Sequence, residues 1–239
     1  MNARELYQAG RLTEAIEALT AEVRSNPTDG QRRTFLFELL CFAGAFDRAA
    51  KQLDVLGQGG QEAAMGMLLY RAALHAEQTR QQMFATGQLP FSTRDPAPVT
   101  GSLNGAAFTT LVDGDPRIGG RLEVFAAGEY LWIPFEHIAS IRIEPPKRLR
   151  DLMWTPAIVR PSRSFKGGEL GEVLLPVLAP GTWRHTDPEI QLGRMTEWQE
   201  LADGREAPVG QKLLLVDGEE CPLLEMRELE LTPVPSAAR

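Results

Sequence analysis

The sequence predicts an α+β protein in which tetratricopeptide-like helical hairpins precede a mostly antiparallel β-rich domain. Three features lead to this prediction: an apolar pattern that repeats near the amino terminus, a segment rich in proline and glycine, and short alternating runs in the second half. The 239 residues are enough for two compact units. We expect a helical domain in residues 1–86, a linker in residues 87–102 and a β-rich domain in residues 103–239.

The repeat is a set of small and large apolar residues that returns after 34 residues. Its first copy is Leu6, Gly10, Leu12, Ala15 and Leu19, and its second copy is Leu40, Gly44, Phe46, Ala49 and Leu53. A glycine in the turn between two helices and an alanine where they cross closely are typical of tetratricopeptide hairpins. Because proteins built from such hairpins usually bind another protein, the repeat favours binding over catalysis.

Each copy of the repeat predicts particular helices. Residues 12–23 form an amphipathic pattern that ends before Pro27, which lacks a backbone N–H and stops a helix. Residues 31–56 predict a second, more apolar hairpin with a neighbour on each side. Residues 62–83 are helical in composition, but no glycine follows at the expected turn. We therefore expect one long capping helix there.

The second half predicts strands joined by tight turns. Alternation is clearest in residues 139–143 and 228–231, where one side would face a core and the other would face water. Strands are expected at residues 122–125, 130–135, 138–143, 172–178 and 211–216, with turns at residues 113–115, 127–128 and 217–218. These runs predict a curved sheet or partial barrel, with one or two short helices near residues 148–154.

Composition excludes several classes of function. The net charge of −7 argues against general binding to nucleic-acid phosphates, and a basic cluster in residues 142–166 is either a solvated face or a surface for an acidic protein. The longest apolar runs are far too short for a membrane span, and charged residues interrupt any export signal at the amino terminus. Two cysteines cannot form a disulfide framework and favour a reducing compartment. We therefore expect a cytoplasmic protein.

The sequence offers little for catalysis. The three histidines have no cysteine or carboxylate at metal-ligand spacing, so we expect no metal and no cofactor. An enzyme would need His185, Asp187 and Cys221 to converge in one pocket as base, orienting carboxylate and nucleophile. Such a hydrolase remains the catalytic alternative to a binding protein.

Repeat spacing also predicts which residues face a partner. The first helices of tandem hairpins line a groove that accepts a partner helix through apolar anchors at i, i+3, i+4 and i+7. Trp154 is a further contact candidate, because residues 149–154 mix charged and apolar residues as an amphipathic helix does. The alternative is that the groove aromatics are ordinary inter-helix packing. The predicted groove residues are Arg4, Tyr7, Thr34, Glu38 and Phe42, joined by His75 from the third helix.

Several segments together point to a known family. In the first half they are residues 6–12, 26–27 and 36–41, and in the second half residues 113–119, 130–135, 145–157, 174–178 and 180–181. With these segments the chain resembles the ImpE family, also called TagJ or SciE, which are accessory proteins of bacterial type VI secretion systems. The run from Pro145 to Ala157 is the most specific, since helical hairpins occur in many unrelated proteins.

The resemblance implies a non-enzymatic cytoplasmic adaptor that binds the contractile sheath. The contact would be made through the amino-terminal helical segment of the small sheath subunit, TssB, and would be linked to sheath assembly or recycling by the ATPase ClpV. The groove residues named above are inferred from spacing and are not transferred from the family. A generic tetratricopeptide-type interaction scaffold remains the alternative to this specific role.

Overall fold

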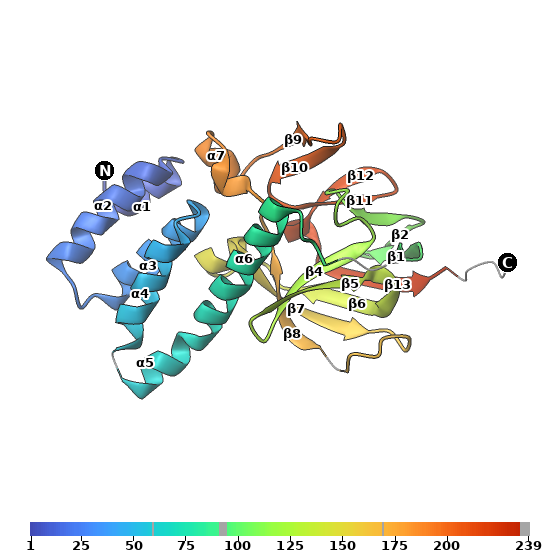
Figure 1. Cartoon of the computed structure of the whole chain (residues 1–239), viewed down its shortest axis with the longest axis horizontal. Coiled ribbons are helices and arrows are strands. Elements are labelled where there is room, and N and C mark those ends of the chain that lie inside the picture. Colours follow the sequence, from blue (N-terminus) through green and yellow to red (C-terminus); the bar gives the residue numbers. More distant parts are fainter. Residues whose placement is uncertain (59, 91–94, 169, 235–239) are drawn as a thin grey trace.

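Helices pack against one side of a curved antiparallel sheet in the computed structural model, which describes residues 1–58, 60–90, 95–168 and 170–234 (Figure 1). The first helices are α1 (Ala3–Gln8), α2 (Leu12–Ser25), α3 (Gly30–Phe42), α4 (Phe46–Gly57), α5 (Gln61–Gly66) and α6 (Leu68–Thr86). Helices α1 to α6 come first in the chain and the strands follow with a further short α-helix among them, so the predicted α+β class is confirmed.

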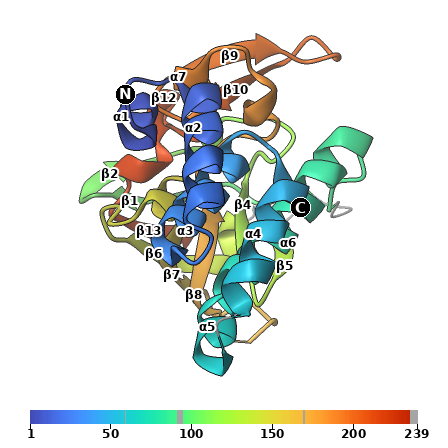
Figure 2. The ribbon, with the colours of Figure 1, turned by 90° about the vertical axis from the view of Figure 1, so that its left-hand side faces the viewer.

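The first four helices form the two predicted hairpins, and Figure 2 shows them in front of the sheet. Helix α1 begins with a reciprocal cap, in which the Glu5 backbone N donates to Asn2 Oδ1 and the Asn2 backbone N donates to Glu5 Oε2, each at 3.0 Å. Helix α2 ends at Ser25, two residues before Pro27, as its sequence predicts. The turns lie at the two repeat glycines, where the backbone φ is positive.

The predicted long capping helix is instead two helices that meet at Met67. Helix α5 ends with Gly66, and glycine in a helix interior costs about 1 kcal/mol relative to alanine, which favours a break at this point. Helix α6 then runs between the hairpins and the sheet, where it contacts both α4 and β5 (Glu129–Pro134) (Figure 1). The capping role is therefore carried by α6, which covers the open end of the hairpins with one face.

The large sheet has the order β2-β1-β13-β6-β7-β8-β4-β5, and each neighbouring pair is antiparallel. Its other strands are β1 (Val99–Leu103), β2 (Ala106–Phe108), β4 (Arg121–Ala126), β6 (Ile138–Ile143), β7 (Trp154–Pro161), β8 (Gly171–Pro176) and β13 (Glu228–Pro233). Two smaller sheets contain β3 (Leu111–Asp113), β11 (Leu213–Val216) and β12 (Glu219–Pro222), and β9 (Thr196–Glu200) with β10 (Glu206–Gly210). The short helix α7 (Pro188–Gln191) precedes β9.

The two runs with predicted alternation, residues 139–143 and 228–231, lie in β6 and β13, where buried and more exposed side chains alternate over residues 141–143 and 229–231. In β6 the side chains of Ile138, Ile141 and Ile143 are buried, whereas Arg142 is exposed. The predicted turn at residues 217–218 joins β11 to β12 with positive φ at both positions, the conformation that a two-residue hairpin requires. Near residues 148–154 the structure has a short 3-10 helix, Leu149–Leu152, and β7 starts directly after it.

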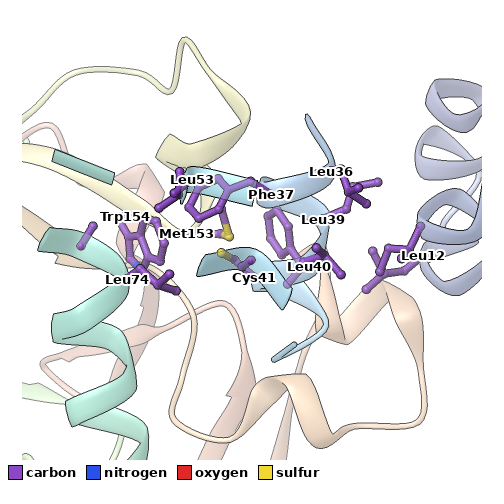
Figure 3. Packing of buried hydrophobic residues seen from close by; sticks show 14 of the residues in the cluster. Leu12, Leu36, Phe37, Leu39, Leu40, Cys41, Leu53, Leu74, Met153 and Trp154 are labelled. Carbon is purple, nitrogen blue, oxygen red and sulfur yellow. The ribbon is translucent and has the colours of Figure 1, made fainter. Parts of the chain in front are cut away.

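One hydrophobic cluster crosses from the helices to the sheet. It joins residues of α2, α3 and α6 to Met153, Trp154 and Leu174, and Figure 3 shows Phe37 and Cys41 of α3 facing Met153 and Trp154. The predicted linker overlaps β1, which begins at Val99, and residues 91–94 of that linker lie outside the described part of the chain. The proposed domain boundaries therefore stay a prediction.

Candidate functional site

A groove of about 730 Å³ lies where the first helices of the two hairpins meet α6 and the 3-10 helix Leu149–Leu152. Its walls therefore come from both the helical and the β-rich parts of the chain. The lining residues are Arg4, Tyr7, Gln8, Gly30, Gln31, Thr34, Phe35, Glu38, Tyr70, Arg148 and Leu149.

The hairpin wall of the groove is aromatic. Tyr7 of α1 and Phe35 of α3 pack edge to face with their ring centroids 5.9 Å apart, and the Arg4 guanidinium lies 5.4 Å from the Phe35 centroid. Arg194 supports this wall from behind, because its guanidinium lies 5.0 Å from the Tyr7 ring and its Nη2 donates to the Tyr7 carbonyl at 2.7 Å. The segment after α7 thus holds the carboxyl end of α1 in place.

The opposite wall is held by an aspartate. Oδ2 of Asp151 accepts hydrogen bonds from the backbone N–H groups of Lys147 and Arg148, each at 2.9 Å, and so orders the turn before the 3-10 helix. The Arg150 guanidinium lies 5.0 Å from the ring of Tyr70, which belongs to α6. This wall therefore combines an aromatic ring with several cationic groups.

Glu38 is the buried acid of the groove, with 7% of its surface exposed. Burial raises the pKa of Glu38 to about 7, although Arg150 and Arg148 lower it and Asp151 raises it further. A carboxyl group with this pKa is only partly ionised near neutral pH. The groove therefore carries a titratable group whose charge depends on what lies beside it.

We expect Glu38→Gln to reduce the pH dependence of stability. Because the folded-state pKa of Glu38, about 7, exceeds its ordinary value of 4.5, the folded protein binds this proton more tightly than the unfolded chain does. The stability contribution is complete below the unfolded pKa and is lost as the pH rises through 7. Urea denaturation of the wild type should show a loss of roughly 2 kcal/mol from this group between pH 5 and pH 8. Other titrating groups affect both proteins alike, so an unchanged pH slope in Glu38→Gln would contradict the raised pKa.

Four of the predicted partner-binding residues, Arg4, Tyr7, Thr34 and Glu38, line the groove together. His75 does not line it; it lies exposed elsewhere on α6. Sequence reasoning missed the other lining residues, which include the apolar or aromatic side chains of Phe35, Tyr70 and Leu149 and the cationic side chain of Arg148. Phe35 was detectable, since it follows Thr34 on α3 and lies three residues before Glu38.

Phe42 and Trp154 correct the expectation of an open contact surface at those positions. Phe42 is 0% exposed and Trp154 is 2% exposed, and both belong to the cluster that joins the helices to the sheet. The Trp154 indole N–H donates to Glu77 Oε2 at 3.0 Å, and its ring packs on Phe37 at a centroid distance of 6.3 Å. Trp154 starts β7 and does not continue an amphipathic helix, so its side chain turns into the core.

A buried ionic cluster joins α6 to the sheet. Arg80 of α6, which is 0% exposed, donates from Nε and Nη2 to both carboxylate oxygens of Glu123 at 2.7 and 2.9 Å. Nζ of Lys212 lies 2.6 Å from the same carboxylate and also pairs with Asp113. Burial alone would raise the pKa of Glu123, but Arg80 and Lys212 hold it well below its usual range. These charges fix α6, and with it Tyr70, relative to the sheet.

The residues of the hydrolase alternative have other partners. The Asp187 carboxylate caps α7 by accepting from the Glu189 backbone N at 2.8 Å, while Nε2 of His185 lies 2.8 Å from Glu197 Oε1. Cys221 lies on β12, its thiol donates to the Pro222 carbonyl, and burial raises the pKa of that thiol. Asp187 therefore does not orient the His185 ring through its carboxylate, and the Cys221 environment does not favour a thiolate.

Within the described ranges, no group of three or more histidine, cysteine, aspartate or glutamate side chains could hold a metal ion. Among the helices that the structure describes, none combines the length and the apolar character needed to cross a membrane.

Comparisons with known proteins give concordant results. A sequence model of the ImpE protein family matches residues 105–230, more than half of the chain. A curated relative from Pseudomonas aeruginosa, named as the type VI secretion system accessory component TagJ, is 34% identical over 266 residues that cover 98% of this chain and 92% of the relative. A crystal structure of a protein from Vibrio parahaemolyticus has a TM-score of 0.82 and 23% identity, covering 97% of this chain and 98% of that chain. The crystal structure establishes a shared fold.

Proposed function

The chain belongs to the ImpE family, and on this premise we propose that it is a non-enzymatic adaptor of a bacterial type VI secretion system. In this proposal the groove between the hairpins and the 3-10 helix Leu149–Leu152 binds the amino-terminal helical segment of the small sheath subunit, TssB. Such binding takes place in the cytoplasm and assists ClpV-linked sheath assembly or recycling. The accessory role is the role named for the Pseudomonas aeruginosa relative.

The observation that carries this proposal is the convergence of four spacing-predicted residues on one groove. Arg4 and Tyr7 come from α1, and Thr34 and Glu38 come from α3, which are the first helices of the two hairpins. In α3, Thr34 and Glu38 stand four residues apart and therefore lie on the same helical face. The groove is thus the surface on which tandem hairpins hold a partner segment.

The chemistry of the groove fits an amphipathic helix. An apolar helix face supplies anchors at i, i+3, i+4 and i+7, and the rings of Tyr7, Phe35 and Tyr70 offer apolar surface to such anchors. Aromatic side chains bury large areas with little loss of side-chain entropy, which is why they dominate the energetics of interfaces. The non-enzymatic assignment is supported by the separate hydrogen-bond partners of His185 and Asp187.

We expect Thr34→Arg to abolish or strongly weaken binding of a synthetic peptide comprising the first two dozen or so residues of the cognate small sheath subunit. Thr34 is half-buried in the groove wall and its hydroxyl only donates to the Gly30 carbonyl of its own helix, so the long arginine fills the groove with little cost to folding. Tyr7→Ala should cost about 1–3 kcal/mol of binding free energy. Isothermal titration calorimetry measures both effects.

Thr20→Arg is the matched control for this experiment. Thr20 lies on α2, is also half-buried and makes the same type of bond, with its hydroxyl donating to the Ile16 carbonyl, but it does not line the groove. This variant should bind the peptide as the wild type does. If the folded wild type fails to bind, the sheath partner does not apply to this chain. If Thr34→Arg binds normally, the contact is made elsewhere.

A further inference from the structure

The groove has an uneven distribution of charge. Arg4 on α1 and Arg148 beside the 3-10 helix both line it, and both side chains are exposed to solvent. Neither arginine forms an ion pair with any carboxylate in the described part of the chain. The Arg4 guanidinium instead lies over the Phe35 ring. Arg4 and Arg148 thus form a cationic rim of the groove and have no ion-pair partner among the residues that the structure describes.

The acids near the groove do not neutralise this rim. Asp151 is buried and uses Oδ2 to accept from two backbone N–H groups, and its other oxygen lies 3.5 Å from Nε of the adjacent Arg150. Glu38 is also buried, and burial raises its pKa to about 7, so at neutral pH much of it is uncharged. The groove is consequently a locally positive surface on a chain whose net charge is −7.

The aromatic residues Tyr7, Phe35 and Tyr70 and the cationic rim together specify the chemistry of an occupant. We propose that the groove selects an amphipathic helix whose apolar face is flanked by carboxylates, with Arg4 and Arg148 as the residues that determine this specificity. The apolar face packs on Tyr7, Phe35 and Tyr70, and the flanking carboxylates pair with the two arginines. This inference rests on the proposed function in placing the partner helix in this groove, and it adds which helix the groove accepts.

Two designed probe peptides test the selection directly. Both are helices of about five turns with the same apolar face, and one carries glutamate at the flanking positions where the other carries lysine. Fluorescence anisotropy should show that the wild type binds the glutamate peptide at least about tenfold more tightly than the lysine peptide. The preference should shrink as the salt concentration rises, because the rim charges are exposed and screened. Equal affinities, or no binding of the glutamate peptide by the folded protein, would overturn the inference.

Variants of the two arginines test whether these residues cause the preference for the glutamate peptide. Arg4→Gln and Arg148→Gln should each weaken binding of the glutamate peptide about three- to fivefold and leave binding of the lysine peptide unchanged or slightly tighter. Arg48→Gln is the matched control, because Arg48 is exposed on α4 and does not line the groove. Glu38→Gln should tighten binding of the glutamate peptide, because it removes the partial negative charge of the Glu38 carboxyl group from the groove. If the two rim variants behave like Arg48→Gln, the arginines do not determine specificity.

The sheath peptide separates this inference from the proposed function. Suppose that Thr34→Arg prevents binding of the sheath peptide, whereas Arg4→Gln and Arg148→Gln leave its affinity unchanged. The adaptor role then stands and the charge selection is wrong. If the glutamate peptide is selected as described but the sheath peptide does not bind, the charge selection stands and the sheath subunit is not the partner.

Discussion

Arg80→Met is expected to lower the free energy of unfolding by about 3–5 kcal/mol, the range found when one partner of a buried ion pair is removed. Arg80 is 0% exposed and donates to both oxygens of Glu123, which is also 0% exposed, and to the Leu178 carbonyl at 3.1 Å. Methionine keeps much of the length of the side chain but leaves the Glu123 carboxylate with Lys212 as its remaining cation. A buried and incompletely compensated carboxylate is what makes the loss large.

Urea denaturation measures this loss, and Arg142→Met provides the comparison. Arg142 pairs with Glu228, but the two side chains are 59% and 45% exposed, so water and salt screen their attraction. That variant should change the free energy of unfolding by no more than about 1 kcal/mol. If Arg80→Met were as mild as Arg142→Met, the buried cluster would not be what holds α6 against the sheet.

Gly44→Ala is expected to destabilise the protein by about 2–5 kcal/mol. Gly44 has a φ of 66°, in the left-handed region where a residue with a Cβ is strained by roughly 1–2 kcal/mol. A Cβ at this position would also overlap the ring of Trp183, which comes from the β-rich part of the chain and is held there by packing on Phe46. Overpacking of this kind adds about 1–3 kcal/mol. The same glycine therefore serves both the hairpin turn and the contact between the two parts of the chain.

Gly87→Ala separates the two costs. Gly87 has a nearly identical φ of 70°, but a Cβ there would meet no atom within 4 Å. In chemical denaturation, Gly87→Ala should lower the free energy of unfolding only by the cost of backbone strain, about 1–2 kcal/mol. Combining Gly44→Ala with Trp183→Ala should show a favourable interaction energy, because removing the ring relieves the overlap. Equal losses for Gly44→Ala and Gly87→Ala would mean that Trp183 moves away at no cost.

Much of the fold and part of the candidate site could be predicted from the sequence. The 34-residue spacing places the hairpin turns at Gly10 and Gly44, and the alternation in residues 139–143 places Ile141 and Ile143 of β6 inside. The same spacing places Arg4, Tyr7, Thr34 and Glu38 in one groove. These successes share a cause: each depends on residues within one turn, strand or repeat, whose geometry is regular.

The remaining features depend on contacts between distant segments. The groove is completed by Tyr70 of α6 and by Arg148 and Leu149, which follow β6. No local sequence pattern predicts that these elements contact the hairpins. Phe42 and Trp154 are aromatic residue types that are common at interfaces. Their side chains are nevertheless buried, because α3, α6 and β7 pack together. Arg80 and Glu123 are 43 residues apart in sequence, and each alone is typical of an exposed surface.

By itself the sequence determined the helical hairpins, the antiparallel strands, the family and four residues of the groove. Only the tertiary structure decided which aromatic residues are buried, which arginines remain at the rim, and which charges are enclosed between α6 and the sheet. The physical reason is that periodicity sets the direction of a side chain relative to its own element, whereas exposure is set by whatever packs against that element from elsewhere in the chain.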